Sequence, residues 1–125
     1  HYDVESNAYP PLGWTSPYYP TWLPEGTKVT QIQIEDQSCF VWYEDKDGYE
    51  FYFSVMSESN QIPAIDTENK EKHEILILDN KATMLYDEKR GIRSLILVTK
   101  ENILVIQGAI SESDAIKIGE NISAL

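Results

Sequence analysis

The chain has 125 residues and a formal net charge of −11, from 21 acidic and 10 basic residues. This charge repels phosphate backbones and anionic membrane surfaces, and no basic stripe with interleaved aromatic residues is present, so we expect neither nucleic-acid binding nor a direct membrane partner. No apolar run approaches the ~18 residues that span a bilayer, and the single cysteine, Cys39, excludes an intrachain disulfide.

Residues 1–22 differ in composition from the rest of the chain. Five of the six prolines precede residue 25, and proline at this density excludes a helix or a central strand. The stretch is nevertheless rich in aromatic residues, in which disordered linkers are poor. We therefore predict an extended N-terminal segment, residues 1–22, packed with its rings on a single α+β domain of residues 23–125. The rings are those of Tyr9, Trp14, Tyr18, Tyr19 and Trp22.

Short β-rich runs separated by polar turns predict seven strands. In the first run the apolar residues fall out of strict alternation, which indicates a bulge near Thr30 and Gln31. Residues 57–70 are polar, contain Pro63 and predict a long loop. The predicted strands are residues 27–34, 39–44, 49–56, 73–78, 81–86, 93–99 and 103–110.

Alternation in the third predicted strand separates a core face from a second face. Tyr52 and Met56 share the second face. The side chains assigned to the core are those of Tyr49, Phe51, Phe53 and Val55.

The end of the chain predicts a helix. Ser111 is its expected N-cap, with Asp114 three residues on as a short-armed capping box. A helix of about three turns with one apolar stripe needs a surface to cover. The expected fold is therefore α+β, a curved antiparallel sheet of about seven strands covered by the C-terminal helix. The stripe consists of Ala115, Ile118, Ile122 and Leu125.

Two stretches carry a resemblance to a known family. Leu23-Pro24-Glu25-Gly26-Thr27-Lys28-Val29 resembles the opening of a family of extracytoplasmic domains of unknown function from Firmicutes. Gly108, Ser111 and the run Lys117-Ile118-Gly119-Glu120-Asn121-Ile122 resemble its ending. The resemblance spans about residues 20–123.

The resemblance implies a location and a kind of function. The family occurs after transmembrane segments in anti-sigma-like proteins, or as lipoproteins, with a shape similar to lipoprotein-carrier and anti-sigma-regulator domains. It implies an extracytoplasmic sensing or interaction domain, membrane-anchored or secreted, with a protein or envelope ligand as partner. We expect membrane attachment only through an anchor outside residues 1–125. The family offers no catalytic residues.

Several motifs for chemistry were weighed and set aside. Asp45-Lys46-Asp47-Gly48 lacks the third oxygen ligand and the bidentate glutamate of a calcium loop, so it predicts a hairpin turn. His73 and Cys39 fall on different predicted strands, which disfavours zinc. A hydrolase would need two carboxylates about 5–10 Å apart, whereas the acidic residues fall mostly in turns and on the polar face of the helix. We expect no metal, no cofactor and no enzymatic activity.

The N-terminal rings form the candidate ligand site. Flat ring faces with polar rims suit glycans and Pro-rich peptides, but rings anchored by prolines also plug the open end of a sheet, which we favour. The first hypothesis is a non-catalytic sensing domain that binds its ligand in the cradle between sheet and helix, or on this segment. The alternative is a carbohydrate- or cell-wall-binding module. The candidate residues are Trp14, Tyr18, Tyr19 and Trp22.

Overall fold

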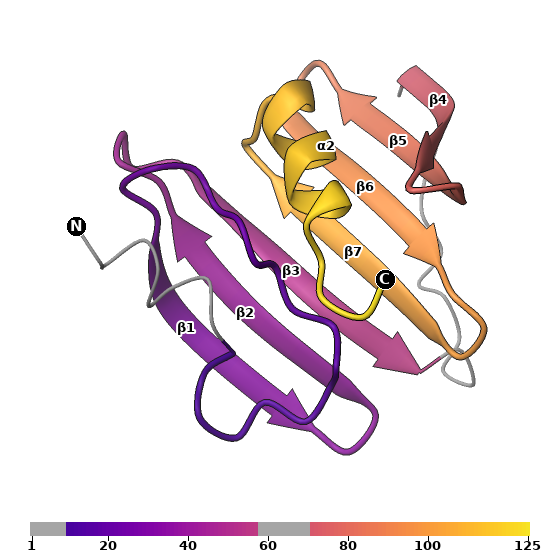
Figure 1. The fold of residues 1–125 in the computed structure, drawn as a ribbon. Coiled ribbons are helices and arrows are strands. Elements are labelled where there is room, and N and C mark those ends of the chain that lie inside the picture. Colours follow the sequence, from indigo (N-terminus) through magenta and orange to yellow (C-terminus); the bar gives the residue numbers. More distant parts are fainter. Residues whose placement is uncertain (1–9, 58–70) are drawn as a thin grey trace.

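The computed structural model describes residues 10–57 and 71–125, which form one antiparallel sheet and a C-terminal helix (Figure 1). The predicted loop at 57–70 lies almost entirely outside the described residues. The fold is α+β and mostly β, as the sequence predicts. The strands are β1 (Lys28–Glu35), β2 (Ser38–Glu44), β3 (Glu50–Ser57), β4 (Glu71–Ile77), β5 (Asn80–Asp87), β6 (Ile92–Val98) and β7 (Asn102–Gly108).

The strand order across the sheet is β1-β2-β3-β7-β6-β5-β4, with every neighbouring pair antiparallel. The chain therefore builds one half of the sheet from β1 to β3. It then crosses to the far edge and returns strand by strand, until β7 pairs with β3 in the middle. The predicted bulge is confirmed, since the β1–β2 register shifts between Val29 and Gln31.

The helix α2 spans Glu112–Glu120 and begins as the sequence predicts. The Ser111 hydroxyl accepts a hydrogen bond from the Asp114 backbone N–H at 3.1 Å, and two acidic residues occupy the first turn. Gly119 lies against Leu95 and Ile77, where a Cβ would come within 3.1 Å of the Leu95 side chain. The missing side chain lets the helix approach the sheet closely.

The predicted end of the helix is wrong. Asn121 terminates it: its side-chain amide donates to the Lys117 carbonyl at 2.7 Å, as its own backbone N–H donates to Ile118. Ile122 follows the helical period but leaves the helix to form an isolated antiparallel bridge with Pro20. Ile122 is still buried, so the stripe reaches the core by a different backbone path.

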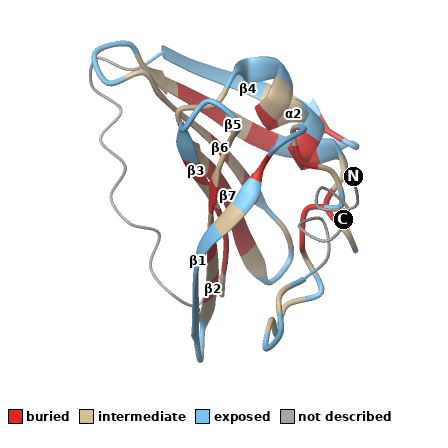
Figure 2. Ribbon diagram, turned by 90° about the vertical axis from the view of Figure 1, so that its left-hand side faces the viewer, coloured by how far each residue is buried: buried red, intermediate tan, exposed pale blue. Residues whose placement is uncertain are grey.

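The described part of the N-terminal segment lies on the same side of the sheet as α2. Tyr19 and Leu23 are each 1% exposed and belong to the main core cluster with Ile118. The Thr21 N–H donates to the Asn121 carbonyl at 2.7 Å. In Figure 2 the buried residues, in red, follow the central strands and the inner side of the helix. The core is therefore enclosed by one sheet face, α2 and the N-terminal segment.

Tyr49 is the one residue predicted for the core face that the structure places outside it. It precedes β3 and is 59% exposed, whereas Phe51, Phe53 and Val55 are buried. The Asp45 carboxylate holds the preceding hairpin loop, accepting from the N–H groups of Asp47 and Tyr49 at 2.9 Å each. Tyr49 therefore belongs to this hairpin loop and not to β3, and the loop directs its side chain away from the core.

Across the described residues, no helix is long and apolar enough to cross a membrane. Nor do residues 10–57 and 71–125 contain any group of three or more His, Cys, Asp or Glu side chains arranged to hold a metal ion.

Candidate functional site

The face of the sheet turned away from α2, here called the outer face, carries three aromatic side chains. Phe40 and Trp42 alternate along β2 with the buried Val41 and Tyr43, so they point to the opposite side of the sheet. Tyr52 on β3 lies directly opposite Trp42 in the register. These three residues form the ring cluster.

The rings of the cluster contact one another and are only partly covered. The Phe40 and Trp42 ring centroids lie 5.5 Å apart with planes 16° from parallel. Tyr52 lies 6.0 Å from Phe40 and 6.2 Å from Trp42. All three side chains have intermediate exposure. Partial burial also raises the pKa of the Tyr52 phenol above its ordinary value.

A groove runs beside the ring cluster across the ends of β3, β7 and β6. It has a volume of about 330 Å³ and is called the outer groove. Gly108 ends β7 at this groove, and only glycine fits there because a Cβ would collide with the Glu50 carbonyl and with Phe51. The lining residues are Trp42, Glu50, Phe51, Tyr52, Arg90, Ile92, Gln107 and Gly108.

Polar side chains line the other wall of the outer groove. Gln107 lies opposite Tyr52 in the register, and its side-chain oxygen accepts from the Ser94 hydroxyl at 3.0 Å, which holds the amide in place. Glu50 contributes a carboxylate. The Arg90 side chain is 80% exposed and its guanidinium lies 3.9 Å from Asp87, so solvent weakens this ion pair and the guanidinium can turn toward a ligand.

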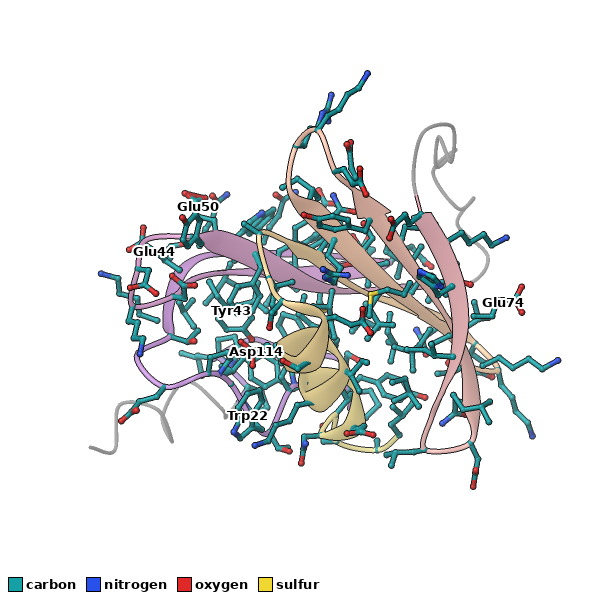
Figure 3. The ribbon with its side chains drawn as sticks, turned by 90° about the horizontal axis from the view of Figure 1, so that it is seen from above. Trp22, Tyr43, Glu44, Glu50, Glu74 and Asp114 are labelled. Atoms are coloured by element: carbon teal, nitrogen blue, oxygen red, sulfur yellow. The ribbon has the colours of Figure 1, made fainter. Side chains whose placement is uncertain are left out.

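The remaining acidic residues labelled in Figure 3 are spread over the molecule. Glu44 lies beside Glu50 and forms an ion pair with Lys28 at 3.3 Å. Glu74 lies near the opposite edge of the sheet, and Asp114 is on the helix. Among these four labelled carboxylates, Glu44 and Glu50 lie beside each other on the outer face, and Lys28 forms an ion pair with Glu44.

The predicted N-terminal site residues lie on the other side of the sheet. Trp14 and Tyr19 contact each other edge to face at 5.1 Å, and Trp14 stacks on Phe53 at 6.2 Å. The Trp14 indole N–H donates to the Tyr18 carbonyl at 2.9 Å. Lys117 places its ammonium 4.4 Å from the centre of the Trp22 ring, a cation–π contact between helix and segment.

The cradle between sheet and helix is thus occupied by the chain's own rings. Tyr19 is buried, whereas Trp14, Tyr18 and Trp22 are partly buried against the core cluster. Binding of a ligand by these four residues stays a prediction from the sequence. A smaller cavity of about 200 Å³ separates Thr15 to Pro17 from the β1–β2 turn, and at its wall the Thr15 hydroxyl lies 3.3 Å from the Cys39 sulfur.

Sequence reasoning missed the ring cluster, although a signal was present. The predicted second strand is apolar on both faces, with Phe40 and Trp42 alternating with Val41 and Tyr43. Two apolar faces indicate either a strand covered on both sides or an exposed binding surface, and only the fold separates these alternatives.

The fold and these two faces define a class of protein: an open-sheet α+β domain whose helix side is closed by its own N-terminal segment and whose outer face carries an aromatic groove. Residues 17–122 match the family DUF4367, a domain of unknown function, and the chain belongs to that family. No curated protein and no solved structure matches the chain significantly.

Proposed function

We propose that this chain is a non-catalytic sensing or interaction domain that works outside the cytoplasm, either anchored to the membrane through a segment outside residues 1–125 or secreted. The observation that carries the proposal is the contrast between the two sheet faces. The helix side is closed by Tyr19, Leu23 and Ile118. The outer face is buried at Ile103 and Val105 on the central strand β7, but around β2 and β3 it presents half-buried rings beside a groove. Half-exposed aromatic patches of this kind mark interaction sites.

Two further features support a binding role. The acidic side chains that resemble reactive groups have structural partners, since Asp45 closes a hairpin and Glu44 pairs with Lys28. The net charge of −11 keeps a domain soluble and repels anionic surfaces. Together with the resemblance to extracytoplasmic domains of Firmicutes, in anti-sigma-like proteins and lipoproteins, these features support an envelope ligand.

Surface labelling tests the location. Intact cells that produce the natural gene product are treated with a membrane-impermeant amine-reactive biotin, and the domain is captured with an antibody raised against residues 10–125. Lysine side chains such as Lys28 and Lys46 are exposed and will react. We expect biotin on the domain in intact cells and on a cytosolic marker only after lysis. A domain labelled only in lysed cells contradicts the proposal.

Sedimentation tests the interaction. The purified domain is mixed with cell envelopes isolated from the source organism and centrifuged. Saturable co-sedimentation that unlabelled domain competes away is expected of an envelope-binding module. A domain that stays in the supernatant at every concentration contradicts this part of the proposal.

A further inference from the structure

The outer groove combines an aromatic wall with a polar wall, and this combination indicates a ligand class. Trp42 and Tyr52 form the aromatic wall, with ring planes inclined at 50° to each other, and Phe40 stacks on Trp42 beside the groove. Aromatic side chains in such positions supply large contact area together with a polar edge. A ligand that packs on the Trp42 ring must itself offer a flat apolar face of comparable size.

The polar wall adds a second requirement. Glu50 offers an acceptor, Arg90 offers donors, and the Gln107 amide, whose oxygen is bound by Ser94, keeps an NH₂ group for donation. The lining contains one carboxylate and one guanidinium, and Asp87 lies beside the guanidinium, so this wall has no excess positive charge. A ligand that complements it is therefore not an anion and carries groups that both donate and accept hydrogen bonds, as sugar hydroxyls do.

The size of the groove sets a limit. A volume of about 330 Å³ lies at the lower end of the range of small-molecule sites, roughly 300–1,000 Å³. It holds one or two sugar rings. The overall charge of −11 disfavours polyanionic chains, since these are repelled before they reach the groove.

From these observations we infer that the outer groove binds a neutral pyranose unit of an envelope polysaccharide. The sugar ring stacks on Trp42, Tyr52 packs against its edge, and its hydroxyls bond to Gln107, Glu50 and Arg90. The inference rests on the proposed function and names the ligand class for it. It moves carbohydrate binding from the N-terminal rings to the opposite face of the sheet.

Titration calorimetry with the full chain tests the inference. The probes are tri-N-acetylchitotriose, cellotriose and, as an anionic counterpart, trigalacturonate. We expect binding of at least one neutral trisaccharide and none of the anionic one. The two neutral probes distinguish an N-acetylhexosamine chain from a plain hexose chain. Failure of both overturns the inference, as does preference for trigalacturonate or binding of a lysine-rich peptide at the groove instead.

Variants locate the binding. Trp42→Ala is expected to weaken binding by about tenfold or more, because it removes the stacking surface. Gln107→Glu keeps every ring and replaces the donating amide by a carboxylate of the same size, so a severalfold loss of binding is expected while the aromatic packing is retained. Tyr49→Ala is the matched control, since it removes an exposed ring that does not line the groove.

Two outcomes of the variant series overturn the assignment. One is binding that survives both Trp42→Ala and Gln107→Glu. The other is binding lost with Trp22→Ala but kept with Trp42→Ala, which returns the ligand to the N-terminal segment. Circular dichroism of each variant identifies a folding defect. If no saccharide binds while surface labelling and envelope sedimentation give the expected results, the carbohydrate assignment is wrong and the proposed function is retained.

Discussion

The burial of Tyr43 makes the stability of the fold depend on pH in the alkaline range. Tyr43 is fully buried, with 0% of its surface exposed, and this burial raises the pKa of its phenol well above the ordinary value of 10.0, with the neighbouring Tyr19 adding to the rise. Burial also raises the pKa of Tyr19. In the unfolded chain both phenols lose their protons near pH 10, whereas in the folded protein they keep them.

The sign of the pH effect follows from this difference. Above pH 10 the unfolded state binds fewer protons than the folded state, so stability falls as the pH rises, by up to about 1.4 kcal/mol per pH unit for each such group. Well below pH 10 both phenols are protonated in both states, so their contribution to the free energy of unfolding does not change with pH. Tyr43→Phe keeps the ring and removes the ionisable hydroxyl. Urea unfolding at pH 8 to 12 should then show that the free energy of unfolding falls less steeply with rising pH than in the wild type. Parallel curves would count against this account.

Single residues also mark where the sequence was and was not sufficient. The burial of Phe51 and Phe53 and the capping role of Ser111 follow from alternation and cap chemistry, which are local properties. The ring cluster does not follow, because nothing local distinguishes the covered face of β2 from the half-open one. Strand neighbours decide this, and they are set by the order of the whole sheet.

At the scale of elements, the helix separates local from tertiary control. Its start is fixed by Ser111, whose hydroxyl bonds to the Asp114 N–H within the same turn. Its end is fixed by Asn121 and by the bridge between Ile122 and Pro20, a partner from the opposite end of the chain. Periodicity alone predicts that Ile122 is helical. It cannot identify the bridge, because an Ile at that spacing is compatible with either structure.

The cap can be tested by substitution at one position. Ser111→Ala removes the acceptor for the Asp114 N–H and is expected to lower the free energy of unfolding by about 1 kcal/mol. Ser111→Asp keeps an acceptor and adds a negative charge at the helix N-terminus, so its stability should stay near that of the wild type. Urea unfolding of the three proteins measures both effects. Stability unchanged in Ser111→Ala would show that the cap contributes nothing, and an equal loss in both variants would show that the side-chain acceptor is not its source.

At the scale of the molecule, chain ends that are distant in sequence close one face of the sheet. The Ser123 hydroxyl donates to the Pro17 carbonyl at 2.6 Å and accepts from the Tyr19 N–H at 3.0 Å, and the Ser123 N–H donates to the Tyr19 carbonyl. The sequence predicts strands, a helix and an extended N-terminal segment. The meeting of that segment with the C-terminal tail is beyond it, because the meeting depends on the β3–β7 pairing at the centre of the sheet.

The Tyr19 ring tests whether this closure carries stability. The ring contacts both Trp14 and Phe53 and is 1% exposed, so Tyr19→Ala removes a filled volume from the core and should lower the free energy of unfolding by about 3–5 kcal/mol. The backbone bonds to Ser123 are kept, which isolates the ring.

Tyr18→Ala is the control: its ring is partly exposed and its carbonyl still accepts from Trp14, so a loss of about 1 kcal/mol is expected. Urea unfolding followed by tryptophan fluorescence measures both, and because Trp14 contacts Tyr19, its emission in folded Tyr19→Ala should also shift to longer wavelength. Equal losses in the two variants would mean that the Tyr19 ring contributes no more stability than a partly exposed ring, so that closure of this face does not hold the fold together.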